Sequence, residues 1–162
     1  MIKLKKRTPL IDQRDKFGFY GNKFGGNYCA ETMRKPIEDL SKLFEKLRKD
    51  RKFLKKRDHY FKHYLGGETP FFKLENLTKH LGGAQIWCKD VSAINGDAHK
   101  AYHATVNALI CKESGKRYIA GDTGAGMFGK NLAMAAKKMN LKCKIFMGTK
   151  DISRQAPNVK FM

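Results

Sequence analysis

The stretch that decides the fold is Gly121-Asp122-Thr123-Gly124-Ala125-Gly126-Met127-Phe128-Gly129, a glycine-rich loop between two regular elements. The apolar run Tyr118–Ala120 before it predicts a short strand, and the apolar spacing after it predicts a helix over Lys130–Met139. Glycines at a strand-to-helix junction leave backbone N–H groups open to an anion at the helix N-terminus. The stretch therefore predicts a βα unit with an anion-binding loop.

The same alternation of strand and helix extends on both sides of this loop. Ile86–Lys89 predicts a strand, Ala98–Cys111 a helix and Lys144–Met147 a further strand. Strand, helix, strand, helix, strand in this order is typical of a right-handed parallel unit. The sequence thus predicts an α/β fold with a small three-stranded parallel βαβαβ unit over residues 84–162.

Helices are predicted to precede this unit. Apolar residues recur at helical spacing in the segment 31–49, namely Met33, Ile37, Leu40, Leu43 or Phe44, and Leu47. The expected helices lie at 31–49, 51–64 and about 74–81. We therefore expect a basic, aromatic- and glycine-rich arm over residues 1–30, followed by a single α/β domain over 31–162 whose helices occupy 31–83.

The chain is strongly basic. Its 162 residues include 34 Lys and Arg against 15 Asp and Glu, for a net charge of +19. Such a charge destabilises a compact chain unless an anionic partner neutralises it, and nucleic acid is the commonest such partner. A basic surface inherited from biased base composition is the alternative. The side chains expected to contact RNA phosphates are Lys3, Lys5, Lys6, Arg7, Arg48, Lys49, Arg51, Lys52, Lys55, Lys56, Arg57 and Lys62.

The cysteine, histidine and hydropathy patterns bear on the compartment of the protein, on metal binding and on membrane association. The four cysteines lie far apart, which favours a reducing intracellular compartment, either the cytoplasm or the mitochondrial matrix. The pairs His59/His63 and His99/His103 have helical zinc spacing but lack further ligands beside them, so no metal is predicted. The sequence has no apolar run of the roughly 20 residues that a membrane span needs, so no membrane partner is expected.

Several further motifs resemble one known family. Glu68-Thr69-Pro70, Gly115-Lys116-Arg117 and Arg154-Gln155-Ala156 are highly specific, and the likeness runs from about Phe17 to Met162. On these motifs the chain resembles the N-terminal portion of the tryptophan synthase β subunit, a pyridoxal-phosphate enzyme. The resemblance implies a truncated fold-type II structure, because family members are much longer and hold the cofactor phosphate with their second half.

The resemblance also implies roles for individual residues. Lys100 would be the lysine that bonds to the cofactor aldehyde, and His99 would assist the cofactor phosphate. Asp122 stands where the family has its catalytic glutamate, an acid–base group. The substrate carboxylate would be bound by the loop formed by Thr123, Gly124, Ala125, Gly126 and Met127.

The sequence departs from the family pattern at demanding positions. Asp97 replaces a glycine and brings a negative charge beside the cofactor phosphate, and Tyr102 replaces an asparagine. Asp122 is one methylene shorter than glutamate, while Met127 and Phe128 replace polar residues of the carboxylate loop. These departures predict a vestigial site that holds no cofactor, or pyridoxal phosphate if the site is still functional.

Charge and motif favour different functions. The charge and the altered site favour a catalytically inactive scaffold that binds RNA as a component of a ribosome or other ribonucleoprotein. Its partners would be rRNA-like RNA and neighbouring proteins, with no DNA specificity, because no base-reading motif is present. The retained lysine and glycine loop favour a pyridoxal-phosphate lyase with tryptophan synthase β activity, completed by a second chain. A partly folded remnant bound to an intact homologue is the third alternative.

Overall fold

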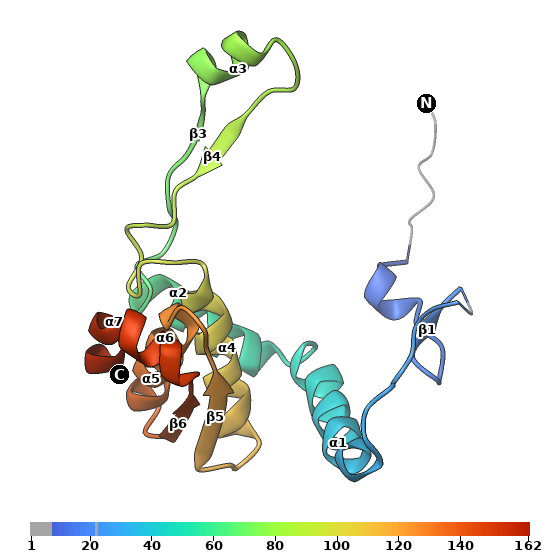
Figure 1. Ribbon diagram of the computed structural model, residues 1–162. Coiled ribbons are helices and arrows are strands. Elements are labelled where there is room, and N and C mark those ends of the chain that lie inside the picture. Colours follow the sequence, from blue (N-terminus) through green and yellow to red (C-terminus); the bar gives the residue numbers. More distant parts are fainter. Residues whose placement is uncertain (1–7, 22) are drawn as a thin grey trace, which may run out of the picture. The chain divides into compact units, whose positions relative to one another are not determined.

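The computed structural model describes residues 8–21 and 23–162 of the chain (Figure 1). By its internal contacts the chain divides into two units, residues up to Lys42 and Leu43–Met162. The expected RNA contacts Lys3, Lys5, Lys6 and Arg7 lie outside the described residues.

The first unit contains a short 3-10 helix and a small hairpin. Leu10–Asp12 forms the 3-10 helix, and β1 (Phe19–Tyr20) pairs antiparallel with β2 (Phe24–Gly25). The Asp15 carboxylate accepts hydrogen bonds from the backbone N–H groups of Phe17 and Phe19, at 2.9 and 2.8 Å. Local polar contacts of this kind fix the entry into β1.

Helix α1 (Glu31–Leu47) begins in the first unit and ends in the second. Its last residue, Leu47, is 5% exposed, whereas Met33 and Leu40 are 51% and 54% exposed. The helix expected over 31–49 is confirmed, and its last residue packs in the core of the second unit. Helical spacing gathers apolar side chains on one face but does not supply the surface that covers them.

The core of the second unit lies between three helices. The Asp50 carboxylate accepts hydrogen bonds from the first N–H groups of α2 (Arg51–His63). Helix α4 (Lys100–Glu113) packs on α5 (Met127–Lys138) along a seam of fully buried alanines. Small side chains let the two backbones approach closely. Larger apolar residues close the core on either side of the seam, namely Leu47, Phe53, Leu109, Leu132 and Met139.

Two parallel strands lie beside this helix pair (Figure 1). The strand β5 (Tyr118–Asp122) pairs with β6 (Lys142–Phe146), and α5 connects them. The short helices α6 (Thr149–Arg154) and α7 (Ala156–Phe161) follow. The expected α/β class is confirmed. The described helices include none long and apolar enough to span a bilayer.

The expected third strand of the parallel unit pairs elsewhere. β4 (Trp87–Lys89) pairs antiparallel with β3 (Phe71–Lys73). The helix α3 (Glu75–Leu81) connects the two strands along the chain. The parallel sheet of the described residues therefore has two strands, and the three-stranded βαβαβ arrangement over 84–162 is wrong in its first strand. β3 is close in sequence, so closing this hairpin costs little loop entropy, and the stacked rings of Phe71 and Trp87 add contact at 5.2 Å.

The turn before α4 is tied to the start of α5 by one buried side chain. The Asn131 amide, 3% exposed, donates hydrogen bonds to the carbonyl oxygens of Gly96 at 3.1 Å and Met127 at 2.9 Å. Gly96 has φ +109°, a conformation that L side chains rarely adopt, and an added Cβ there would collide with the Asn131 amide oxygen. The loop expected to extend to Gly129 is shorter in the structure, because α5 begins at Met127 and Met127–Gly129 are helical.

Substitution of Gly96 should disrupt its contact with the Asn131 side chain and destabilise the fold. Gly96→Ala forces both a strained backbone and a clash with Asn131, at a cost of about 1–3 kcal/mol or more. We expect the melting temperature, followed by circular dichroism, to fall by at least about 4 °C. The matched control is Gly124→Ala, because Gly124 has no positive φ and open space at its Cβ position. Equal melting temperatures for the two variants would contradict the proposed role of Gly96.

Candidate functional site

Lys100 is the first residue of α4, directly after the exposed His99. The Lys100 side chain is half-buried, and within the described residues its amine has no recorded hydrogen bond or ion pair. An amine without a carboxylate partner is free to react with a ligand, whereas a paired one must first be released. The structure thus places the expected nucleophile at a helix start whose preceding turn is fixed by Asn131.

The charge of Asp97 is compensated within the chain. The carboxylate of Asp97 pairs with the Lys130 amine of α5 at 2.7 Å, and the Lys130 side chain is only 13% exposed. The same amine lies 5.1 Å from the ring centroid of Phe161. Asp97 was expected to repel a phosphate beside Lys100. In the structure its charge faces a cation, so the turn carries a neutral pair instead of a free anion.

Asp122 and Thr123 lie where β5 ends. The exposed Asp122 carboxylate has no recorded partner in the described part of the chain. The Thr123 N–H donates to the Phe146 carbonyl at 3.0 Å, which prolongs the parallel ladder by one bond. A carboxylate at the C-terminal edge of a parallel strand is in the usual position for groups that contact ligands.

The loop after Thr123 holds open backbone N–H groups. Gly126 has φ +83° and directly precedes α5, and the Asn158 amide donates to the Ala125 carbonyl at 2.9 Å. The N–H groups of Gly124, Ala125 and Gly126 donate to no acceptor recorded among the described residues. Together with the first N–H groups of α5, they form a surface suited to a carboxylate or phosphate.

The apolar replacements near this loop serve packing. The Phe128 ring lies 5.2 Å from the His103 ring of α4 and packs against the main core. Tyr102 packs edge-on against Phe61 at 4.9 Å, and its hydroxyl donates weakly to the Gly67 carbonyl at 3.4 Å. Where the resemblance implies polar groups, this chain uses aromatic rings to hold α4 against α2 and α5.

The arrangement fits part of a pyridoxal-phosphate site. Such a site needs a free amine for the aldehyde, anion-binding N–H groups for the substrate carboxylate and a cradle for the cofactor phosphate. The unpaired Lys100 amine could supply the first, and the N–H groups of residues 124–126, which have no acceptor recorded among the described residues, could supply the second. His99 is the one predicted phosphate contact in this region, so the described residues supply only a small part of a cradle.

The basic face of α2 is partly neutralised. Lys56 pairs with Glu113 of α4 at 2.6 Å, and Arg57 pairs with Asp58 at 2.7 Å. The Glu113 carboxylate raises the pKa of the Lys56 amine above its ordinary value. Arg48 and Lys49 share Glu45, at 2.7 and 3.9 Å. The exposed cations that have no recorded acidic partner in the described residues are Arg51, Lys52, Lys55 and Lys62.

Two residues of α5 escaped the sequence predictions. Asn131 and Lys130 fix the turn before Lys100, yet each is an ordinary polar residue of a helix in the sequence. The one available signal was an asparagine at a core-facing position of α5, between Phe128 and Leu132. The histidine pair at 59 and 63 has ring centroids 4.7 Å apart, and the described residues contain no group of three side chains that could hold a metal.

Comparison with known proteins agrees with these features. Residues 63–161 match the family described as "Pyridoxal-phosphate dependent enzyme". The chain is 39% identical over 145 residues to the tryptophan synthase beta chain of Fusobacterium nucleatum subsp. nucleatum, which covers 90% of this chain and 36% of that relative. The chain therefore spans little more than a third of its relative's length. With its lysine, glycine loop and α/β scaffold, it belongs to the pyridoxal-phosphate dependent enzymes and is tryptophan synthase β-like.

Proposed function

We propose that this chain supplies the lysine-bearing part of a pyridoxal-phosphate lyase site of the tryptophan synthase β type. The observation that carries the proposal is the Asn131 amide, which joins the turn before Lys100 to the first residue of α5. This joint brings an unpaired amine and an anion-binding loop to the same end of the α4–α5 pair. Polypeptide outside residues 1–162 would provide the phosphate cradle.

Each group has a distinct task in this proposal. When bound, pyridoxal phosphate supplies an electron sink that stabilises negative charge on the substrate. The Lys100 amine would hold the cofactor, and the N–H groups of residues 124–126 would orient the substrate carboxylate. The Asp122 carboxylate accepts and returns a proton at its oxygens. Because the Asp122 side chain is one methylene shorter than glutamate, its carboxylate would lie about an ångström from the position that glutamate would give it. Such a displacement would slow proton transfer roughly 100-fold.

Labelling of Lys100 tests this proposal. Incubation of the chain with substoichiometric pyridoxal phosphate, followed by borohydride reduction and peptide mass spectrometry, should place most of the label on Lys100. Lys100→Arg keeps the charge but should lose that label and the visible absorbance that accompanies binding. The matched control is Lys79→Arg, an exposed lysine of α3. Label spread evenly over surface lysines in the unaltered chain would refute a retained cofactor lysine.

RNA binding is the second candidate function. The observation in its favour is the row of exposed, unpaired cations on α2, which could follow a phosphate backbone. In this role the chain would be a scaffold in a ribosome or other ribonucleoprotein, in the cytoplasm or the mitochondrial matrix, with rRNA-like RNA and neighbouring proteins as partners. Family membership favours the lyase function over this one.

Neutralising the unpaired cations of α2 tests RNA binding. A variant that replaces three of them by glutamine should bind a single-stranded RNA oligomer more weakly, and the slope of log K against log salt should decrease by up to about 2. The replaced residues are Arg51, Lys52 and Lys62, whereas Lys55 is kept because it also lines a cavity between α2, α4 and α5. A control with the same charge change replaces the exposed Lys79, Lys116 and Lys160. If both variants lose the same affinity, the total charge and not this face determines binding.

A further inference from the structure

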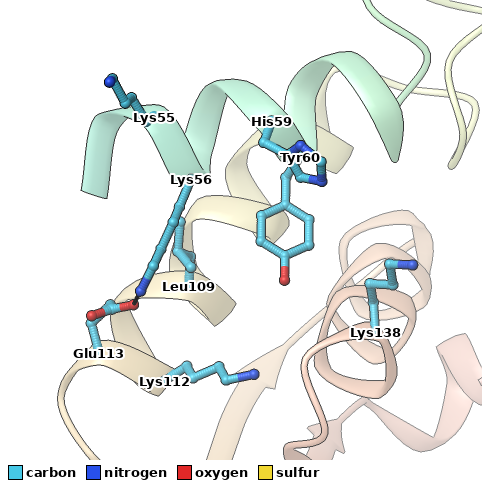
Figure 2. A pocket seen from close by; sticks show the side chains of 8 residues that line it. All are labelled: Lys55, Lys56, His59, Tyr60, Leu109, Lys112, Glu113 and Lys138. Carbon is cyan, nitrogen blue, oxygen red and sulfur yellow. Dashed lines mark hydrogen bonds and ion pairs between the residues drawn. The ribbon is translucent and has the colours of Figure 1, made fainter. Parts of the chain in front are cut away.

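A second anion-binding feature lies at the opposite end of the α4–α5 pair. An open cavity of about 580 Å³ is formed by residues of α2, α4 and α5 (Figure 2). Lys112 and Glu113 lie in the last turn of α4 and Lys138 ends α5, whereas Lys100 begins α4. At about 1.5 Å of rise per residue, the length of α4 separates this cavity from Lys100 by about 20 Å. The cavity is therefore distinct from the proposed cofactor site.

The Tyr60 hydroxyl points from α2 toward the side of the cavity on which α4 and α5 end. Figure 2 shows Lys112 below this hydroxyl and Lys138 to the side of it, with Lys56 beside the buried Leu109. The Lys138 amine lies 5.6 Å from the ring centroid of Tyr64, on a flexible side chain that lines the cavity. No partner is recorded for the Tyr60 hydroxyl in the described part of the chain. A hydroxyl beside lysine side chains is placed to donate to an anion that they attract.

The cavity lining carries a positive charge, and only part of this charge is paired with an acidic side chain. Glu113, the one acidic residue of the lining, is engaged by Lys56 at 2.6 Å. Lys112 and Lys138 have no acidic partner recorded in the described residues. Lysines in the last turn of a helix also stabilise the helix end, so charge alone selects no ligand. The Tyr60 hydroxyl is a second argument for a ligand, because stabilisation of the helix ends by lysines does not involve this hydroxyl.

We propose that this cavity binds the phosphate groups of a small phosphorylated compound through Lys112, Lys138 and the Tyr60 hydroxyl. Its volume lies within the range of small-molecule sites. A concave site with convergent donors suits a compact anion, whereas an RNA backbone would need cations in a row, as on the outer face of α2. The proposal does not depend on Lys100, so failure of cofactor labelling leaves it untouched.

Titration with pyrophosphate tests this site. Calorimetry on the full chain at physiological salt should show saturable binding, and Lys112→Gln with Lys138→Gln should weaken it by about tenfold or more. The matched control combines Lys79→Gln with Lys150→Gln, two exposed lysines outside the cavity, and should change affinity less than about twofold. No saturable binding by the unaltered chain, or equal weakening in both double variants, would overturn the proposal.

Two further measurements separate a built site from general attraction. Tyr60→Phe keeps the ring and the fold but removes the hydroxyl, so it should weaken pyrophosphate binding by about threefold to tenfold without a change in melting temperature. Unchanged affinity in this variant counts against the site. Excess single-stranded RNA should not displace pyrophosphate from the cavity, and stoichiometric displacement would assign Lys112 and Lys138 to an RNA surface instead.

Discussion

One buried amide joins the turn before Lys100 to the start of α5. Asn131 donates both of its side-chain N–H bonds inside the structure, one to the turn before α4 and one to the first residue of α5. A buried amide without these acceptors would cost its full desolvation, so the two segments cannot separate cheaply. The close approach requires glycine at position 96, since any Cβ would enter the space of the Asn131 side chain. Together with the Asp97–Lys130 pair and the buried alanines between α4 and α5, this contact holds the turn before Lys100 against the start of α5.

The distribution of charge divides the molecule into regions with different chemistry. At one end of the α4–α5 pair, Asp97 and Lys130 neutralise each other beside open backbone N–H groups. At the other end, Lys112 and Lys138 face a cavity whose one acidic residue is engaged by Lys56. The outer face of α2 carries further cations. These ion pairs leave the net charge of +19 unchanged, because each of them combines one positive and one negative group.

The residues that depart from the expected family pattern have structural roles in this chain. Asp97 pairs with Lys130, while the rings of Tyr102 and Phe128 pack between helices. The turn that carries Lys100 is therefore held by the chain's own contacts.

The sequence by itself determined the local elements and the family. Apolar spacing located α2, α3, α4 and the strands β5 and β6 to within a few residues, because each element depends on backbone preferences and on one apolar face. The lysine and the glycine loop were recognisable because their chemistry needs particular residue types at short spacing.

Only the tertiary structure decided what these elements contact. It paired β4 with β3, matched Asp97 to Lys130 and placed Tyr60, Lys112 and Lys138 in the lining of one cavity. Such contacts join residues far apart in sequence. They depend on which partner best compensates the loss of water and chain entropy, and no local pattern encodes that comparison.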